Sequence, residues 1–347
     1  MSGFISIFLT CLVFFIIYQI AKASELAGIL RGEEKTKAQT NRLMGWLLVA
    51  FFLLGLYGIY QCHIDMIDKM LPVSASDHGV QYDSMLYITL VVTGIVFFLT
   101  QTALFWFAFR YQASEHRKAH FYSHNNKLEV IWTTIPAIAM ALLVIVGLKN
   151  WGTMTSDAPK DAMVVEIVGK QFNWITRYPG KDGVLGKKDF RMTNDVDNVL
   201  GMDWNDKNNH DDVVMQNGEL HLVKGKPVKL IIGSRDVIHD VGLPHFRMKM
   251  DAVPGIITTM WFTPTITTKE MKEITGNPDF VYEISCDQMC GKGHYSMRGT
   301  VIVHSEAEFR AWMRMQKPYY AGNKAPEKSA PAQPEQKTDS VNAITMK

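Results

Sequence analysis

The stretch Cys286-Asp-Gln-Met-Cys-Gly-Lys-Gly-His-Tyr-Ser-Met297 brings two thiols, an imidazole and a thioether together within twelve residues. The runs 280–285 and 300–304 on its two sides have the composition of strands. The glycines between them argue against a regular helix. We therefore expect a loop that connects two strands at one end of a β-sandwich, because loops on rigid strands make good metal sites.

Short β-rich runs separated by turn residues fill the second half of the chain. Many short strands without helical periodicity between them predict an antiparallel sandwich or a Greek-key barrel. Segment 180–218 is rich in Gly, Asp, Asn and Lys and is expected to be an inserted excursion outside the core. The predicted strands are Ala162–Val168, Asn173–Tyr178, Glu219–Val223, Val228–Ser234, Thr258–Thr263, Phe280–Ser285 and Thr300–His304.

The first half of the chain is apolar and predicts a membrane region. Four segments, 4–21, 43–61, 84–110 and 128–149, each approach the roughly 20 residues that a helix needs to cross the hydrocarbon core. The first segment could instead be a secretory signal, since Ala21-Lys-Ala23 resembles a cleavage site. No Lys or Arg precedes it, however, so we interpret it as a retained helix.

Basic residues between these segments indicate their orientation. Segment 22–42 carries five Lys or Arg residues and segment 111–127 carries three, whereas segment 62–83 carries only Lys69. The positive-inside rule places the two basic loops in the cytoplasm. The N-terminus, segment 62–83 and everything after Trp151 are then outside.

The predicted organisation has five parts. They are two N-terminal transmembrane helices in 1–61, an external loop in 62–83, a transmembrane hairpin in 84–150, a β domain in 151–320 and a disordered tail in 321–347. The tail prediction rests on its prolines and its scarcity of apolar residues.

Composition excludes two classes of protein. The formal net charge is +2 and no Lys/Arg cluster has interleaved aromatic residues, so nucleic acid is not an expected partner. Four cysteines in 347 residues, two of them in or next to apolar segments, do not predict a disulfide framework. A disulfide between Cys286 and Cys290 is an alternative, although it would not explain the His and Met that follow.

Soft thiolate and thioether ligands with imidazole favour copper over oxygen-loving cations. One Cys, two His and one Met would hold a single copper ion, so the second thiol suggests two ions bridged by both sulfurs. The second imidazole is expected from His239, with His245 as the alternative. A structural zinc ion held by the two cysteines with His239 and His294 is an alternative to copper, although it leaves Met297 without a role.

The remaining histidines and two nearby methionines are expected to have no part in the metal site. We interpret the histidines as surface or strand residues and the methionines as packing residues. They are His210, His221, His304, Met248 and Met250.

Three motifs together resemble subunit II of haem-copper cytochrome c oxidase, which carries the binuclear copper A centre. They are Asp236-Val-Ile-His239, Lys249-Met-Asp-Ala-Val-Pro-Gly255 and Cys286-x3-Cys290-x3-His294-x2-Met297. The run Lys127-Leu-Glu129-Val-Ile-Trp132-Thr-Thr-Ile-Pro136 is similar to the start of that family's second helix. The resemblance covers about 84–315 and implies a cupredoxin-like sandwich.

The resemblance also implies a role for each residue of the copper site. Cys286 and Cys290 would be bridging thiolates, and His239 and His294 would be terminal ligands. Met297 would be one axial ligand, and the backbone carbonyl of Gln288 would be the other. Many relatives have Glu at position 288, where its side chain helps to hold magnesium at the interface with subunit I. The neutral amide here puts that magnesium site in doubt.

Two further functions are implied by the resemblance. Glu129 matches an acidic residue at the cytoplasmic mouth of a proton path, with an ordinary helix-start carboxylate as the alternative. In Gln171-Phe-Asn-Trp-Ile-Thr-Arg-Tyr178, the position that accepts the electron is Phe172, and Trp174 follows two residues later. Strand alternation would put both rings on one face, and packing is the alternative role for both.

The family implies an electron-accepting subunit of an oxidase that reduces oxygen to water and pumps protons. We expect a location in the inner membrane with the copper domain in the periplasm, and partners that include subunit I and other oxidase subunits. The sequence has no Cys-x-x-Cys-His motif, so the cytochrome c donor is expected to be a separate protein. Helices 4–21 and 43–61 are additional to the usual two and could pack against oxidase subunits or another respiratory complex.

Three other classes of protein fit the sequence less well. A quinol-oxidase subunit II would have lost the copper ligands, which are all present here. A nitrous-oxide reductase copper domain would follow a large propeller that 347 residues do not accommodate. The non-redox alternative is a membrane receptor or adaptor whose domain is stabilised by a structural zinc ion.

Overall fold

The computed structural model describes residues 2–31, 33–113 and 117–322. The chain divides into two compact units, one formed by 1–73 with 82–150 and the other by 74–81 with the residues from Trp151 onward. The tail predicted to be disordered lies outside the described residues from position 323.

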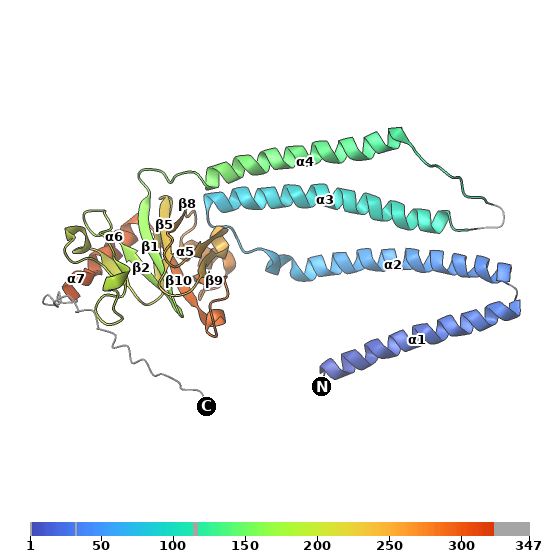
Figure 1. Ribbon diagram of the computed structural model, residues 1–347, viewed down its shortest axis with the longest axis horizontal. Coiled ribbons are helices and arrows are strands. Elements are labelled where there is room, and N and C mark those ends of the chain that lie inside the picture. The colour runs from blue at the N-terminus through green and yellow to red at the C-terminus, as the bar shows by residue number, and fades with distance from the viewer. Residues whose placement is uncertain (1, 32, 114–116, 323–347) are drawn as a thin grey trace, which may run out of the picture. The chain divides into compact units, whose positions relative to one another are not determined.

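Four long helices form the first unit, and two of them have end residues that belong to the second, 77–81 and 151–154 (Figure 1). All four are long and apolar enough to cross a membrane, which confirms the four predicted spans. Aromatic rings pack α2 against α3, with Trp46 and Phe109 at 4.8 Å and Phe52 and Phe105 at 4.9 Å between ring centroids. The helices are α1 (Ser2–Arg31), α2 (Glu33–Met70), α3 (Asp77–Arg110) and α4 (Asn126–Met154).

The connections between helices are shorter than the sequence predicted. Segment 62–83 is mostly helical, because α2 continues to Met70 and α3 starts at Asp77. Pro72 explains where α2 ends, since a proline disfavours the helical conformation of the residue before it. Most of segment 22–42 is helical as well. A hydropathy pattern marks where the apolar residues stop, and a helix can continue past that point.

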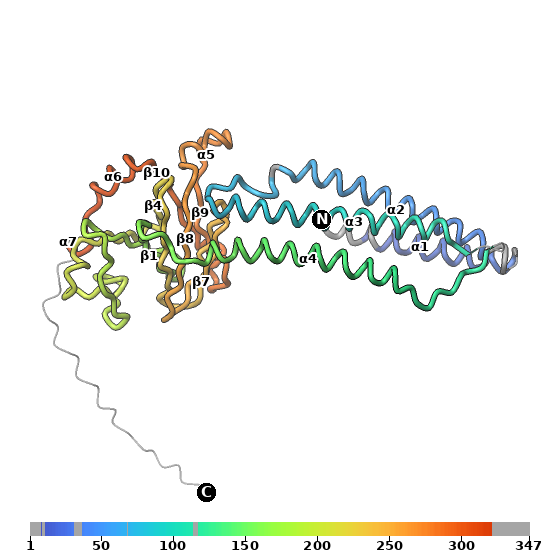
Figure 2. Tube along the Cα trace, turned by 90° about the horizontal axis from the view of Figure 1, so that it is seen from above, coloured from blue at the N-terminus to red at the C-terminus, as the bar shows by residue number. Residues whose placement is uncertain are grey.

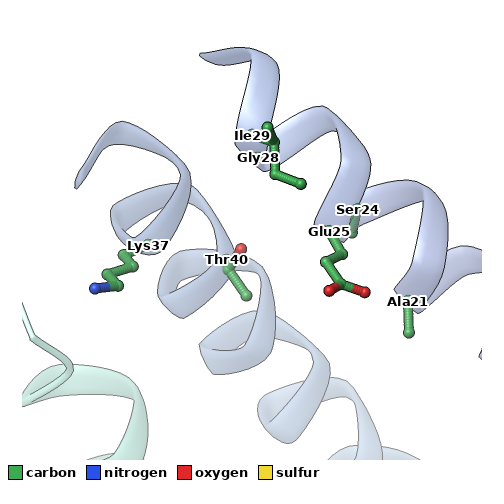
Figure 3. Close-up of a pocket in the computed structure, with 7 residues that line it drawn as sticks. All are labelled: Ala21, Ser24, Glu25, Gly28, Ile29, Lys37 and Thr40. Carbon is green, nitrogen blue, oxygen red and sulfur yellow. The ribbon is translucent and has the colours of Figure 1, made fainter. Parts of the chain in front are cut away.

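A cavity of about 620 Å³ lies between α1 and α2 (Figure 3). Glu25 from α1 and Lys37 from α2 are its charged lining residues. Cys286, Cys290 and His294, where the sequence predicts the metal site, belong to the other unit.

Two five-stranded sheets form the sandwich of the second unit, and Figure 2 follows the same strands along the Cα trace. The first sheet has the order β3-β2-β1-β5-β8 and the second β4-β10-β9-β6-β7. The strands are β1 (Met163–Lys170), β2 (Asn173–Tyr178), β3 (Val213–Met215), β4 (Glu219–Val223), β5 (Val228–Ser234), β6 (His239–Leu243), β7 (Met248–Ala252), β8 (Thr258–Phe262), β9 (Tyr282–Cys286) and β10 (Arg298–His304).

The predicted sandwich is confirmed, but a wholly antiparallel pattern is wrong. β1 pairs parallel with β5, and β10 pairs parallel with β4. Three strands, β2, β4 and β5, have the predicted bounds, whereas β3, β6 and β7 were missed. β6 has the sequence His-Asp-Val-Gly-Leu and β7 has Met-Lys-Met-Asp-Ala, and neither is rich in β-branched or aromatic residues.

Helices in the second unit were also missed by the sequence. Ser305 and Thr267 are N-caps, and the side chain of each accepts a hydrogen bond from the backbone amide of a Glu three residues later. The side chain of that Glu accepts a hydrogen bond from the backbone amide of the N-cap residue. This capping box starts a short helix even where hydrophobic periodicity is brief. The helices are α5 (Thr268–Thr275), α6 (Glu306–Met315) and α7 (Tyr319–Gly322), with 3-10 turns η1 (Phe190–Met192), η2 (Lys207–Asn209), η3 (Pro244–Phe246) and η4 (His294–Ser296).

Segment 180–218 is not an excursion outside the core, as the sequence suggested. It covers the outer face of β1 and β2, where Val168 and Ile175 form a second apolar cluster with residues of the segment. β1 is therefore buried along most of its length rather than on alternate residues. The cluster residues contributed by the segment are Val199, Leu200 and Met202.

Beside this cluster, the guanidinium of Arg177 is buried within a group of polar side chains. Its Nε donates to Asp212 Oδ2 at 2.8 Å and its Nη1 pairs with Glu166 Oε2 at 3.1 Å. Asn209 Oδ1 accepts from Nη2 at 2.6 Å. The network joins β1 and β2 to the covering segment, which therefore acts as a third layer.

We predict that Arg177→Ala lowers the free energy of unfolding by about 3–5 kcal/mol, because removal of one partner leaves buried carboxylates without a counter-charge. Urea unfolding of the full chain in detergent, followed by tryptophan fluorescence, measures this loss. Arg191→Ala is the matched control, since the Arg191 side chain is 77% exposed and pairs with Asp189 at 3.8 Å. Equal losses in the two variants would contradict the network's role.

Candidate metal centre

Three neighbouring strands bring the predicted ligands to one end of the sandwich. His239 is the first residue of β6 and Cys286 is the last residue of β9, which pair in register at Val241 and Cys286. Met297 directly precedes β10. The residues between Cys286 and Met297 form the loop that the glycines predicted, and it supplies Cys290 and His294.

The side chains converge within a few ångströms. Cys286 Sγ lies 3.8 Å from His239 Nδ1 and 3.7 Å from Cys290 Sγ. Cys290 Sγ lies 3.7 Å from His294 Nδ1 and 3.9 Å from Met297 Sδ. The ligand atoms of His239, Cys286 and Cys290 are all within 4.8 Å of one another, and these three side chains are buried.

Both thiols are free. Their separation of 3.7 Å is well above the roughly 2.05 Å of a disulfide, so the disulfide alternative is wrong for this structure. Two thiols, one imidazole and a thioether that are buried, with a second, partly buried imidazole, have the donor chemistry of a copper site. The residues therefore fit the metal that the sequence predicted.

His239 is held in one orientation by three neighbours. Its Nε2 lies 2.8 Å from Asp236 Oδ1, so Nδ1 is the nitrogen left for a metal. A Cβ placed on Gly169 would come within 2.7 Å of the imidazole Cδ2, so only glycine allows this approach. The indole of Trp174 packs edge to face with the imidazole, with a centroid distance of 6.0 Å.

Backbone contacts fix the loop around the thiols. Gln171 Nε2 donates to the carbonyl of Cys290 at 2.6 Å, and the amide of Cys286 donates to the carbonyl of Met297 at 3.1 Å. The carbonyl of Gln288 lies 3.2 Å from Cys286 Sγ, whereas the Gln288 side chain is exposed. A backbone oxygen is thus directed at the site, as the resemblance implied.

Two groups at the site have displaced pKa values. Burial, with the adjacent Cys286 thiol, raises the pKa of Cys290 to about 11. Partial burial opposes the shift at Asp236, but hydrogen bonds from the Gln171 amide, His239 and the Val237 amide hold the pKa of that carboxyl below its usual range. The Asp236 carboxylate therefore stays ionised at neutral pH, whereas the Cys290 thiol stays protonated until a metal binds.

A group of carboxylates next to the site was missed by the sequence analysis. Asp240 is 3% exposed and faces Asp251 across β6 and β7, and Lys249 Nζ lies 3.9 Å from Asp240 and 4.0 Å from Asp287. Burial and the hydrogen bond with Asp251 raise the pKa of Asp240 to about 7. No spacing rule connects these positions, because the pairing of β6 with β7 brings them together.

The other histidines and the two methionines lie away from the thiols. His245, the alternative second imidazole, packs against the rings of Phe280 and Tyr282. His221 and His304 are in strands β4 and β10, and His210 follows η2 and contacts the carbonyl of Trp204. Met248 and Met250 pack against the main core, as predicted.

The expectation that Phe172 and Trp174 share a strand face is wrong. Phe172 lies in the turn between β1 and β2, so strand alternation does not apply to it. Trp174 is fully buried in the main core. Phe172 is partly buried, and a Cβ on Gly293 would come within 2.5 Å of its ring, which places that ring directly against the ligand loop.

Glu129 belongs to the other unit. It lies in the first turn of α4 and is exposed. The helix is capped by Asn125, whose Oδ1 accepts from the Leu128 amide at 3.1 Å. The predicted position at a helix start is confirmed.

Comparisons with known families match both halves of the chain. Residues 67–149 match the family described as "Cytochrome C oxidase subunit II, transmembrane domain", and residues 163–305 match "Cytochrome C oxidase subunit II, periplasmic domain". The segment before residue 67, which holds α1 and most of α2, precedes both matches.

Curated relatives agree with these matches. "Alternative cytochrome c oxidase subunit 2" of Bradyrhizobium diazoefficiens is 38% identical over 237 residues, which is 68% of this chain and 80% of that protein. "Cytochrome c oxidase subunit 2" of Thermostichus vulcanus is 29% identical over 78% of this chain and 84% of that protein. Among solved structures, the periplasmic domain of subunit II of cytochrome oxidase of Bradyrhizobium japonicum is 25% identical and has a TM-score of 0.30, covering 45% of this chain and 94% of that one.

Asp236→Asn is predicted to weaken metal binding by about 10- to 100-fold, because the amide no longer fixes the tautomer of His239 and lowers its basicity as a ligand. Competition between the protein and a chelator of known copper affinity measures the change. Asp279→Asn, at an exposed position outside the site, is the control. Unchanged affinity in Asp236→Asn would show that this carboxylate does not orient the ligand.

Metal uptake should weaken as the pH falls. The pKa of Cys290 is raised, so its thiol is protonated throughout the neutral range and must lose that proton on binding. Apparent affinity should therefore drop by about tenfold per pH unit for each proton released. Chelator competition between pH 6 and 8 tests the sign, and affinity that is independent of pH would contradict thiolate ligation.

Proposed function

Because the chain belongs to the cytochrome c oxidase subunit II family, we propose that it receives electrons from cytochrome c at a binuclear copper centre and passes them to subunit I, which reduces oxygen to water. Its family is a copper A-binding one, and its members are subunits of an oxidoreductase complex. The observation that supports the proposal best is the pair of free, buried thiols 3.7 Å apart with an imidazole beside each.

A site with one copper ion would use one thiol and leave the other without a role. A site with two copper ions uses both. Cys286 and Cys290 are proposed as bridging ligands, with His239 and His294 as terminal ligands. Met297 and the carbonyl of Gln288 are proposed as axial ligands. When bound, the two copper ions supply one-electron redox chemistry shared over both metals.

The protein's own contribution is to keep these ligands fixed and dry. His239 and Met297 are fully buried, and Cys286 and Cys290 are nearly so. Ligands held by three adjacent strands and by Gln171 have little freedom to move when the charge of the site changes. That rigidity suits electron transfer, in which reorganisation of the site slows the reaction.

Magnesium at the interface with subunit I would need a different ligand from the one in many relatives. The exposed side chain at position 288 is a neutral amide. An amide oxygen attracts Mg²⁺ less than a carboxylate does, because hard cations favour charged oxygen ligands.

We propose an inner-membrane location with four spans and both the first helix start and the sandwich on the periplasmic side. Four apolar helices and the periplasmic-domain match support this arrangement, and so does the Lys/Arg asymmetry of the connections. An even number of spans returns the chain to the side on which it began.

In this orientation Glu129 is on the cytoplasmic side, where it is proposed to open a proton path into subunit I. Helices α1 and α2 are proposed to pack against other oxidase subunits or another respiratory complex. The electron is proposed to enter at the ring of Phe172, which covers the ligand loop, rather than at the buried Trp174.

Cys290→Ser tests the proposed function. With one bridging sulfur gone, copper content should fall from about two ions per chain to one or none, and the mixed-valence absorbance should change to that of a mononuclear site or vanish. Metal analysis and optical spectroscopy of the copper-loaded protein measure both.

Cys62→Ser is the matched control, because Cys62 is an exposed thiol on α2. It should leave both the copper content and the spectrum unchanged. One zinc per chain in the wild-type protein, or an unaltered spectrum in Cys290→Ser, would contradict the binuclear centre.

A further inference from the structure

The turn between β1 and β2 contains a glutamine that forms hydrogen bonds to two separate parts of the metal centre. Gln171 follows Lys170, the last residue of β1, and precedes Phe172. Its side-chain Nε2 donates to the carbonyl of Cys290 at 2.6 Å. Its backbone amide donates to Asp236 Oδ2 at 2.7 Å. A residue next to the first sheet therefore holds two segments that lie next to the second.

The bond from the side chain fixes the backbone at a proposed bridging ligand. Cys290 Sγ lies 3.7 Å from Cys286 Sγ and 3.7 Å from His294 Nδ1, so a rotation of the peptide after Cys290 would change both separations. The next residue, Gly291, has a φ of 131°, which favours glycine. A Cβ there would come within 3.0 Å of Gln171 Nε2. Glycine at this position therefore lets the loop approach the glutamine.

The bond from the backbone amide fixes the carboxylate beside the other ligand. Asp236 Oδ2 accepts from Gln171, whereas Asp236 Oδ1 lies 2.8 Å from His239 Nε2 and accepts from the Val237 amide at 2.7 Å. A carboxylate with both oxygens bonded has one orientation. Because this carboxylate leaves His239 Nδ1 for the metal, Gln171 acts on His239 through Asp236.

The two ligands that Gln171 reaches come from different elements. His239 starts β6, whereas Cys290 belongs to the loop that follows β9. The Gln171 side chain is exposed, so it adds little to the packing of the core. Its hydrogen bonds are therefore its main contribution, and both of them lead to the metal centre.

We propose that Gln171 is a positioning residue of the copper centre. Its side chain fixes the backbone of Cys290, and its backbone amide fixes the carboxylate that orients His239. The two ligands therefore keep their relative positions when the charge of the site changes. This inference rests on the proposed function, and it assigns Gln171 an action through the Cys290 carbonyl and Asp236 rather than as a ligand.

Gln171→Met in the full chain, purified in detergent and loaded with copper, tests the side-chain bond, because methionine has a similar length but cannot donate. Copper affinity should fall about tenfold, as expected when a residue that supports a metal ligand is removed. The reduction potential should fall as well, because an N–H donor near a thiolate favours the more electron-rich reduced site. Chelator competition and a spectroelectrochemical titration measure these two changes.

Gln171→Glu is the second variant. At neutral pH it places a carboxylate where the donor was, so the reduction potential should fall further than in Gln171→Met. The thiolate-to-copper absorbance should shift in both variants. A residue with a purely structural role would change the free energy of unfolding but neither the potential nor the spectrum of the copper-loaded chain.

Gln316→Met is the matched control. Gln316 Nε2 also donates to a backbone carbonyl, that of Trp312 at 3.2 Å, but it does so at the end of α6. The same substitution there should leave copper affinity, potential and spectrum unchanged.

The link to His239 is tested by combining Gln171→Met with Asp236→Asn. Residues in one hydrogen-bond network do not act additively. The affinity loss of the double variant should therefore be at least about threefold smaller than the product of the two single losses. Chelator competition on the four chains measures this coupling.

Two results would overturn the inference. One is an unchanged affinity, potential and spectrum in Gln171→Met, which would show that the bond to Cys290 does not position the ligand. The other is a double variant whose loss equals the product of the single losses, which would show that the two ligands are not coupled through Gln171. A wild-type chain that binds no copper would instead refute the proposed function, and the inference with it.

Discussion

The contact between His239 and Gly169 joins the two sheets at the end where the thiols lie. The imidazole belongs to β6 of one sheet and the glycine to β1 of the other, and no Cβ fits between them. Asp236 then fixes which nitrogen faces Cys286. Because one ring is held by both sheets, the position of this proposed metal ligand follows from the packing of the whole sandwich rather than from the loop alone.

Segment 180–218, the third layer, packs on the outward face of β1 and β2. β1 and β2 carry apolar and charged residues on their outward face, and segment 180–218 buries them with a second cluster and the Arg177 network. A strand buried on both faces has few ways to shift. Asp195 of the same segment pairs with Lys170, the last residue of β1, and with Arg235, so the segment is also attached next to Gly169, which packs against His239.

Sequence reasoning predicted the four apolar helices and the sandwich, because hydropathy and strand composition are local signals. The side chains that it proposed as copper ligands lie together around the two thiols. It did not find β6 and β7, whose residues have weak strand propensity and form strands through their partners. Trp174 and Phe172 were misplaced because alternation cannot reveal where a turn begins. The Asp240 and Asp251 pair and the Arg177 network depend on strand register, which no single segment encodes.

The rigid set of side chains around the two thiols suits the electron transfer that we propose for this chain. Burial and adjacent strands limit movement of the ligands, which keeps reorganisation small. The ring of Phe172 lies against Gly291 and Gly293, and a Cβ on Gly293 would come within 2.5 Å of it, so this ring helps to fix the ligand loop.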